Sequence, residues 1–141
     1  MKNISFFKEF TEPELFETVR LCIWLKFSKD DLIIREGEMG KSFWIILKGS
    51  VRVVKKILDG TIVRRTLTII PPGECLGEMS MISGASRTAD IIANEEVFLA
   101  KIDGYLINQV ADSLQLKFYK RFSEILVSRL ARSSQLLVEQ K

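Results

Sequence analysis

Histidine is absent from this chain of 141 residues. Without an imidazole there is no Ser/His or Cys/His pair for acyl transfer, and zinc loses its commonest nitrogen ligand. The sequence therefore predicts that the chain is not an enzyme and has no catalytic residue and no metal site. Catalysis by carboxylates alone is the enzymatic alternative that this composition leaves.

Cysteine is nearly absent. Cys22 and Cys75 each stand alone in an apolar stretch and form no Cys-x-x-Cys pair. We expect two buried, reduced thiols, with a redox role or a disulfide as the alternative.

Long apolar runs are missing as well, since none approaches the roughly 20 residues of a membrane-spanning helix. Residues 1–6 lack the apolar core of a secretory signal. We therefore expect a cytoplasmic protein with no membrane.

The charge balance is nearly even, with 21 Lys and Arg against 18 Asp and Glu, a net charge of +3. An excess of this size is too small to indicate nucleic acid by itself, so we do not expect nucleic acid as a partner. Hydrophobic residues make up 47% of the chain, enough for the core of one globular domain over residues 1–141.

Near the N-terminus, the residues predict a short helix. Thr11 is suited to cap it, Glu14 to complete a capping box, and Pro13 to occupy the first turn, where no backbone N–H is needed. Its expected apolar side consists of Leu15, Phe16 and Val19.

Short β-favouring runs follow, separated by Gly, Pro and Asp turns, and predict a β-sandwich or β-roll. Asp59-Gly60 is the clearest hairpin turn. The strands are expected at residues 21–27, 32–35, 43–47, 51–54, 62–70, 90–93 and 97–100.

After Asp103 the pattern becomes helical. A short helix is expected over 104–111, and a longer one, capped by Ser113, to about Val138. One apolar stripe on the long helix consists of Phe118, Phe122, Ile125, Leu126, Leu130 and Leu137. The opposite, charged side consists of Lys117, Lys120, Arg121, Glu124, Arg129 and Arg132.

The stretch from Gly73 to Ala89 is the most informative one. It places a Gly-Glu pair at the start of a helix-like run and an arginine, Arg87, nine residues after Glu78. Backbone N–H groups at a helix start and a guanidinium both attract phosphate oxygens. A carboxylate repels a bare phosphate but accepts hydrogen bonds from hydroxyls, so the segment predicts a pocket for a sugar phosphate.

These residues carry a resemblance to a known family. Gly77-Glu78-Met79-Ser80 and Ser86-Arg87-Thr88-Ala89 resemble the phosphate-binding cassette of cyclic nucleotide-binding domains, of the cyclic AMP receptor and protein kinase A regulatory-subunit type. Residues 4–7, 33–40 and 43–51 resemble that family's entry, first hairpin and next strand pair, so the likeness covers roughly residues 4 to 138.

The resemblance implies a mainly β fold, a β-roll with a short N-terminal helix and a long C-terminal helix. Its parts would be an N-terminal helical segment over about 1–20, a β-roll over 21–102 with the cassette at 73–89, and C-terminal helices over 103–141. The family's Pro before the arginine is replaced by Ser86, and its Phe before the Gly-Glu pair by Leu76. The first change alters loop rigidity, whereas the second keeps an apolar wall.

The ligand-binding roles that the resemblance implies are specific. Arg87 would bridge the exocyclic oxygens of the cyclic phosphate, and Glu78 would accept a hydrogen bond from the ribose 2′-OH. Gly77 would let the backbone approach the ligand closely. Backbone N–H groups would come from Met79 and Ser80.

Thr88 is compatible with guanine recognition and with cyclic AMP binding, so it does not decide the base. The expected ligand is cAMP ahead of cGMP. The terminal helix would close over the base as a lid, with three candidate residues, Arg129, Arg132 and Ser133. Its stripe would serve as core or as the seam of a homodimer.

The function that the resemblance implies is a regulatory module without catalysis, acting on a partner protein. A DNA-binding regulator is the alternative, but the chain stops at Lys141, soon after the long helix, with no helix-turn-helix. A cyclic nucleotide hydrolase and a degenerate domain that dimerises without ligand are weaker alternatives.

Overall fold

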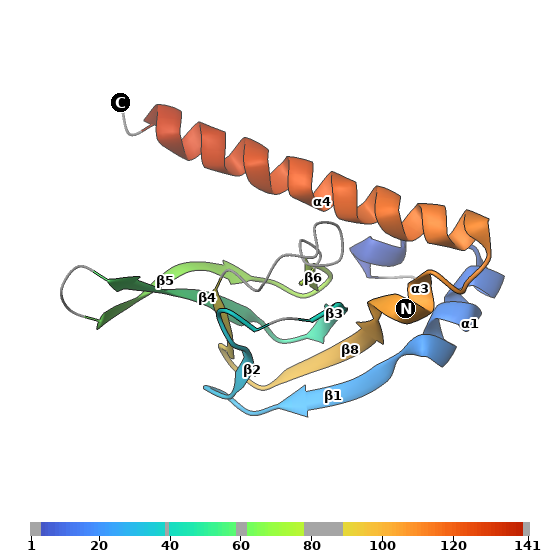
Figure 1. The fold of residues 1–141 in the computed structure, drawn as a ribbon, viewed down its shortest axis with the longest axis horizontal. Coiled ribbons are helices and arrows are strands. Elements are labelled where there is room, and N and C mark those ends of the chain that lie inside the picture. Colours follow the sequence, from blue (N-terminus) through green and yellow to red (C-terminus); the bar gives the residue numbers. More distant parts are fainter. Residues whose placement is uncertain (1–3, 39, 59–61, 78–88, 140–141) are drawn as a thin grey trace.

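Two antiparallel β-sheets with helices at both ends of the chain make up the fold (Figure 1). The structure, a computed structural model, describes residues 4–38, 40–58, 62–77 and 89–139, with side chains described except at 56–58, 62–64 and 132–139. The elements are, in order, η1 (Ser5–Phe7), α1 (Glu12–Leu21), β1 (Ile23–Phe27), β2 (Leu32–Ile34), β3 (Ser42–Lys48), β4 (Val51–Leu58), β5 (Ile62–Ile70), β6 (Cys75–Leu76), β7 (Asp90–Ala93), β8 (Val97–Asp103), α3 (Gly104–Ile107) and α4 (Asp112–Glu139).

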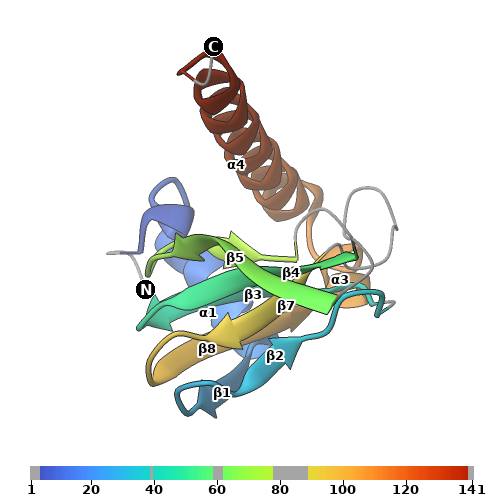
Figure 2. The ribbon, with the colours of Figure 1, turned by 90° about the vertical axis from the view of Figure 1, so that its left-hand side faces the viewer.

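The strands are shared between two four-stranded sheets, in the orders β1-β8-β3-β6 and β2-β7-β4-β5. Figure 2 shows the strands of both sheets running beneath α4, which projects away from them. This arrangement confirms the predicted β-roll with a short N-terminal and a long C-terminal helix. The cassette, residues 73–89, contains β6 of one sheet and ends directly before β7 of the other, so it connects the two sheets.

Helix α1 begins with the predicted capping box. The Glu14 N–H donates to Thr11 Oγ1 at 3.3 Å, and the Thr11 N–H donates to Glu14 Oε1 at 2.9 Å. Burial alone would raise the pKa of Glu14, but the hydrogen bonds from Lys117 and Thr11 outweigh it and lower that pKa. Glu14 therefore caps α1 and pairs with α4 at the same time.

The apolar side predicted for α1 is partly wrong. Leu15 is buried, but Phe16 is 68% exposed and Val19 is 37% exposed. Thr18 is buried in their place, because its hydroxyl donates to the Glu14 carbonyl at 2.8 Å and so needs no water. The helix also continues to Leu21, so β1 begins at Ile23 rather than at 21.

An aromatic cluster joins the two ends of the chain. Ring centroids lie 6.1 Å apart for Phe6 and Phe118, and 4.8 Å apart for Phe43 and Phe122. The cluster, which we call the phenylalanine core, consists of Phe6, Phe7, Phe10, Phe43, Phe118 and Phe122, all buried. A second apolar core lies around Ile46, Val51 and Leu99. The phenylalanine core therefore holds the first half of α4 on the body.

Four predictions for the C-terminal helices need correction. The short helix ends at Ile107, and α4 begins at Asp112, so Ser113 lies inside α4 and does not cap it. Leu130 is 67% exposed, although the neighbouring Arg129 still contacts the body through the Cys75 carbonyl. Arg121, expected on the solvent side, is buried against the N-terminal segment.

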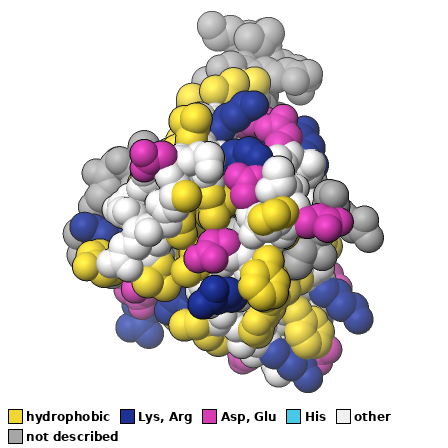
Figure 3. All heavy atoms as spheres, turned by 90° about the vertical axis from the view of Figure 1, so that its right-hand side faces the viewer, with side chains coloured by type: hydrophobic (Ala, Val, Ile, Leu, Met, Phe, Trp, Pro, Cys, Tyr) yellow, Lys and Arg dark blue, Asp and Glu magenta, His cyan; other side chains and the backbone are white. Residues whose placement is uncertain are grey.

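The remaining composition-based expectations concern thiols, membranes and surface. Neither Cys22 nor Cys75 forms a disulfide within the described part of the chain; the predicted burial is complete for Cys75, whereas Cys22 is half-buried. Among the described residues, no helix combines the length and the apolarity that a membrane span needs. Figure 3 shows hydrophobic side chains scattered among charged ones over one end of the molecule.

Candidate functional site

The structure describes the frame of the cassette rather than its centre. Five of the predicted binding residues lie outside the described residues: Glu78, Met79, Ser80, Arg87 and Thr88. Two predicted lid residues have a described backbone on α4 but side chains outside the description: Arg132 and Ser133. Gly77 and Arg129 are described in full, and both lie at the entrance of the cassette.

The entrance of the cassette is held by backbone pairing. Gly73, with φ of 91°, donates its N–H to the Ile46 carbonyl at 2.7 Å and accepts from Ser5 Oγ at 3.1 Å. Strand β6 then pairs with β3, with Cys75 opposite Ile45. The chain therefore leaves the sheet at a fixed point before it reaches Gly77.

Gly77 turns the chain out of β6. Its φ is 84°, a left-handed conformation that costs an L side chain about 1–2 kcal/mol. Glycine is suited to this position because it has no Cβ. This conformation redirects the chain after β6. That Gly77 lets the backbone approach a ligand closely stays a prediction.

Arg129 ties the terminal helix to the same entrance. Its Nη2 donates to the carbonyl oxygen of Cys75 at 2.8 Å, between residues 54 positions apart in the chain. A charged donor makes this bond stronger than a neutral one. The predicted lid residue therefore contacts the backbone that leads into the cassette, and a shift of α4 would pull on that backbone.

The exit of the cassette is anchored by a buried carboxylate. Asp90 is only 3% exposed, and its Oδ1 accepts the backbone N–H of Glu36 at 2.6 Å. On the ladder it lies opposite Val54 of β4. The described part of the cassette is thus fixed at both ends, to β3 and α4 at the entrance and to the residues after β2 at the exit.

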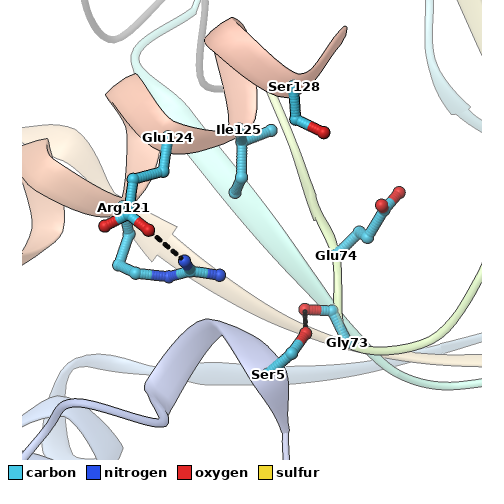
Figure 4. Close-up of a pocket in the computed structure, with 7 residues that line it drawn as sticks. All are labelled: Ser5, Gly73, Glu74, Arg121, Glu124, Ile125 and Ser128. Carbon is cyan, nitrogen blue, oxygen red and sulfur yellow. Dashed lines mark hydrogen bonds and ion pairs between the residues drawn. The ribbon is translucent and has the colours of Figure 1, made fainter. Parts of the chain in front are cut away.

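A cavity of about 250 Å³ lies where α4, the N-terminal segment and the cassette entrance meet. Figure 4 shows side chains from all three elements around it. It is lined by Ser5, Gly73, Glu74, Arg121, Glu124, Ile125 and Ser128. The cavity therefore lies directly between α4 and the entrance of the cassette.

Arg121 is the polar centre of this junction. Its Nε donates to the Phe6 carbonyl at 2.9 Å, its Nη1 donates to Glu124 Oε2 at 3.1 Å, and its guanidinium carbon lies 5.5 Å from the centre of the Phe6 ring (Figure 4 shows the Glu124 pair). Glu124 Oε1 is buried without a hydrogen-bond partner among the described residues.

Sequence reasoning missed Asp90 and Arg121. Asp90 left a signal, because a carboxylate at the head of the apolar strand Asp90–Ala93 needs a buried hydrogen bond to remain there. Arg121 lies between two stripe phenylalanines, and the pattern of residues in α4 does not show that the N-terminal segment covers this position.

Comparison with known proteins places this geometry in a family. A sequence model described as "Cyclic nucleotide-binding domain" matches residues 24–113. Human cGMP-dependent protein kinase 2 is 32% identical over 116 residues, which cover 82% of this chain and 15% of the kinase. The cyclic AMP receptor protein of Thermus thermophilus is 34% identical over 67 residues, covering 48% of this chain and 30% of that protein. The chain therefore spans a small part of these relatives.

Solved structures agree on the fold. A cyclic nucleotide-binding domain from Methylobacillus flagellatus superposes with a TM-score of 0.85 at 25% identity, covering 94% of this chain and 75% of that one. The regulatory domain of Toxoplasma gondii PKA, crystallised with cAMP, superposes with a TM-score of 0.72 at 23% identity, covering 87% and 47%. The second likeness supports the fold alone.

Proposed function

Since the chain belongs to the cyclic nucleotide-binding domain family, we propose that it binds a cyclic purine mononucleotide through Arg87 and Glu78. The family is one of regulatory modules. The observation that carries the proposal is the frame of the cassette, with both ends anchored and Gly77 in a left-handed conformation directly before Glu78. Such a frame holds both ends of the segment that would carry the ligand.

The charges of Arg87 and Glu78 suit them to different parts of the ligand. The guanidinium of Arg87 neutralises the cyclic phosphate through a fork of N–H donors. The carboxylate of Glu78 accepts the ribose 2′-OH and so distinguishes a ribose from a 2′-deoxyribose. Backbone N–H groups of Met79 and Ser80 complete the site, and the Thr88 hydroxyl contacts the phosphate or the purine.

The terminal helix supplies the response. Arg129 already bonds the entrance of the cassette, and Arg132 and Ser133 lie one turn further along α4, where they would cover the base. A ligand shifts the position of α4 only by binding one arrangement more tightly than the other. The module acts without catalysis, so the nucleotide would be recovered unchanged after a long incubation.

The preferred base is proposed to be adenine. Cyclic AMP receptor protein is among the relatives, whereas cGMP-dependent kinases match a longer part of the chain. The affinities for cAMP and cGMP should therefore be measured side by side. Thr88 is the residue to exchange for alanine if cGMP proves the tighter ligand, because its hydroxyl is the group that suits guanine.

The output is proposed to be a homodimer joined along α4, or a contact with a partner protein. Val127 and Leu130, three residues apart on α4, are 66% and 67% exposed. Two such helices packed side by side would bury this pair. Sedimentation with and without ligand measures the association directly.

Calorimetric titration of the full chain with cAMP and cGMP tests the proposal. Truncating one member of a buried charge pair costs about 2–5 kcal/mol, so Arg87→Ala should weaken binding by roughly 30-fold to several thousandfold at about 1.4 kcal/mol per tenfold. Glu78→Gln should reduce the preference for cAMP over its 2′-deoxy analogue.

Arg20→Ala is the matched control, since Arg20 is an exposed arginine of α1 that forms a long ion pair of 3.9 Å with Glu17. It should leave both affinities unchanged. The proposal is wrong if neither nucleotide releases or absorbs heat with the parent chain, or if Arg87→Ala binds as the parent does.

A further inference from the structure

Strand β1 differs from the other three edge strands that the structure describes. The two sheets end at β1 and β6 in one and at β2 and β5 in the other. Strand β6 has two residues, and the ladders of β2 and β5 each contain a register shift. Strand β1 pairs with β8 without a shift over all five of its residues, Ile23–Phe27. Short strands and irregular ladders discourage an edge from pairing with another chain, so β1 lacks two of the usual protections.

The edge formed by β1 leaves apolar side chains in water. Ile23 is 56% exposed and Trp24 is 51% exposed. Successive residues of a strand point to opposite faces of the sheet, so apolar surface is open on both faces of this edge. Figure 1 shows β1 along the lower border of the body, on the side away from α4. A further strand beside β1 would cover both side chains.

A row of cations and an aromatic ring runs across the sheet toward this edge. Phe98 of β8 lies between Lys26 of β1 and Lys48 of β3 in the ladder. The Nζ atoms of the two lysines lie 5.7 Å and 5.9 Å from the centre of the Phe98 ring, within the range of a cation–π contact. Lys26 also pairs with Glu96 across 3.5 Å, but both side chains are mostly exposed, so this pair is weak. The row ends at Lys26, where a strand beyond the edge could add a second aromatic ring.

The sequence of β1 supplies such a ring when a second copy of the strand pairs with it antiparallel. A two-fold axis through Leu25 places Ile23 opposite the second copy's Phe27, and Trp24 opposite the second copy's Lys26. Apolar residues then face apolar residues on one side of the sheet, and each Trp24 lies beside a Lys26 on the other. This register pairs all five residues. The next register toward the end of β1 would place Lys26 opposite itself, which is unfavourable.

We propose that two copies of this chain associate through antiparallel pairing of β1, which joins their four-stranded sheets edge to edge into one continuous sheet. Every side-chain contact except the one at Leu25 occurs twice, as two-fold symmetry requires. A strand pairing over five residues is a small interface, and small interfaces belong to weak, transient complexes. The dimer is therefore in exchange with the monomer.

A second copy suits this edge better than an unrelated strand does. Backbone hydrogen bonds would admit any extended segment, whereas the side chains of β1 match their own sequence in one register. The contact shares no residue with the one proposed along α4, and it requires no nucleotide. The two contacts can therefore be tested separately.

Cysteine cross-linking of the full chain tests the register. Each residue of β1 is replaced in turn by cysteine in a chain carrying Cys22→Ala/Cys75→Ala, and the variants are incubated in a glutathione redox buffer. Leu25→Cys should form a disulfide dimer, because opposite residues of an antiparallel pair have Cα atoms about 4.5–5.5 Å apart, which a disulfide spans. Ile23→Cys is the matched control on the same face, since its equivalent in the second copy lies four residues along the strand, at least about 13 Å away.

This control also separates pairing from random collision. Ile23 is exposed, whereas Leu25 is partly buried. Collisions between unpaired chains would therefore cross-link cysteine at 23 faster than cysteine at 25, whereas pairing through β1 gives the opposite order.

Sedimentation of the parent over a concentration series measures the association itself. Trp24→Lys removes two cation–π contacts from the dimer and places like charges opposite each other, so the association should weaken about 10-fold or more. Phe16→Lys makes the same kind of change at an exposed ring of α1 and should leave the association unchanged. The exchange variant Trp24→Lys/Lys26→Trp again places a lysine opposite a tryptophan and should recover most of the association.

Several outcomes would overturn the proposal. These are a parent chain that stays monomeric throughout the series, faster cross-linking at another position of β1 than at 25, and a loss of association in Phe16→Lys as large as in Trp24→Lys. Val127→Lys/Leu130→Lys on α4 should leave the cross-link at 25 unchanged. Loss of that cross-link would assign the association to α4 instead of β1.

Discussion

Arg129 and Cys75 lie on the last helix and on the strand that leads into the cassette, and the guanidinium of the first donates to the carbonyl of the second at 2.8 Å. Because the acceptor is a backbone carbonyl, a substitution of the Cys75 side chain does not remove the acceptor of this bond. The contact makes the position of α4 and the conformation of the cassette entrance depend on each other, whichever nucleotide the site prefers.

Removing this guanidinium should loosen the entrance. We expect Arg129→Met to lower the free energy of unfolding by about 1–2 kcal/mol, since a hydrogen bond from a charged donor is lost while the stem is kept. Amide hydrogen exchange should become faster at Leu76 and Gly77. The control, Lys120→Met, removes an exposed ion pair with Glu9 and should change stability by less than about 1 kcal/mol. Equal effects of the two variants would contradict the coupling.

Arg121 should matter more for stability than its place on a helix surface indicates. Arg121→Met removes the donor to the Phe6 carbonyl and the partner of Glu124. Because the acceptor is left buried and unpaired, we expect a loss of about 2–3 kcal/mol in a denaturant melt. Arg20→Met, at an exposed arginine paired over 3.9 Å, should cost less than about 0.5 kcal/mol. A similar cost for both would show that the N-terminal segment does not depend on Arg121.

Two glycines with the same backbone conformation allow strain and crowding to be separated. Gly37 and Gly49 have φ of 89° and 86°. A Cβ on Gly37 meets nothing within 4 Å, whereas a Cβ on Gly49 overlaps the carbonyl oxygen of Glu96. Gly37→Ala should therefore cost about 1–2 kcal/mol from strain, and Gly49→Ala about 1–3 kcal/mol more from overpacking. Chemical denaturation measures both, and equal costs would contradict the close approach.

The thiol of Cys22 should be unreactive near neutral pH. Burial raises its pKa from 9.0 to about 11, and its Sγ donates to the Thr18 carbonyl at 3.2 Å. Since only the thiolate is alkylated, iodoacetamide at pH 8 should modify the native chain about 100-fold more slowly than the unfolded chain. Mass spectrometry of the labelled peptide measures this ratio.

The same shift has a consequence for stability. A thiol with a raised pKa keeps its proton in the folded chain while the unfolded chain loses it, so this contribution to stability falls as pH rises from about 9 to about 11. Cys22→Ala should lose less stability than the parent over that interval. Identical pH profiles would show that the thiol is not protected by burial.

Features that depend only on residues close together in the sequence could be predicted from it. The capping box at Thr11 and Glu14 and the strand over 62–70 were both predictable, because capping and β-pattern act over a few residues. The binding residues were identified by a motif of the same kind. Their positions stay predictions, since residues 78–88 lie outside the part of the chain that the structure describes.

Contacts across the fold were not predictable. Phe16 is apolar yet exposed, and Arg121 is charged yet buried, because burial depends on which element packs on each face. The bonds from Arg129 to Cys75 and from Glu36 to Asp90 join residues more than fifty positions apart. Such partners leave no local signature, so the anchors of the site appear only once the chain is folded.

The phenylalanine core determines how the protein can be shortened. The span that the family shares, residues 24–113, contains Phe43 but excludes Phe6, Phe7, Phe10, Phe118 and Phe122. An expression clone cut to that span would lack the N-terminal segment and nearly all of α4, and would uncover the side of β3 that Phe43 occupies. The region by which the family is identified is therefore smaller than the part of the chain that builds the hydrophobic core.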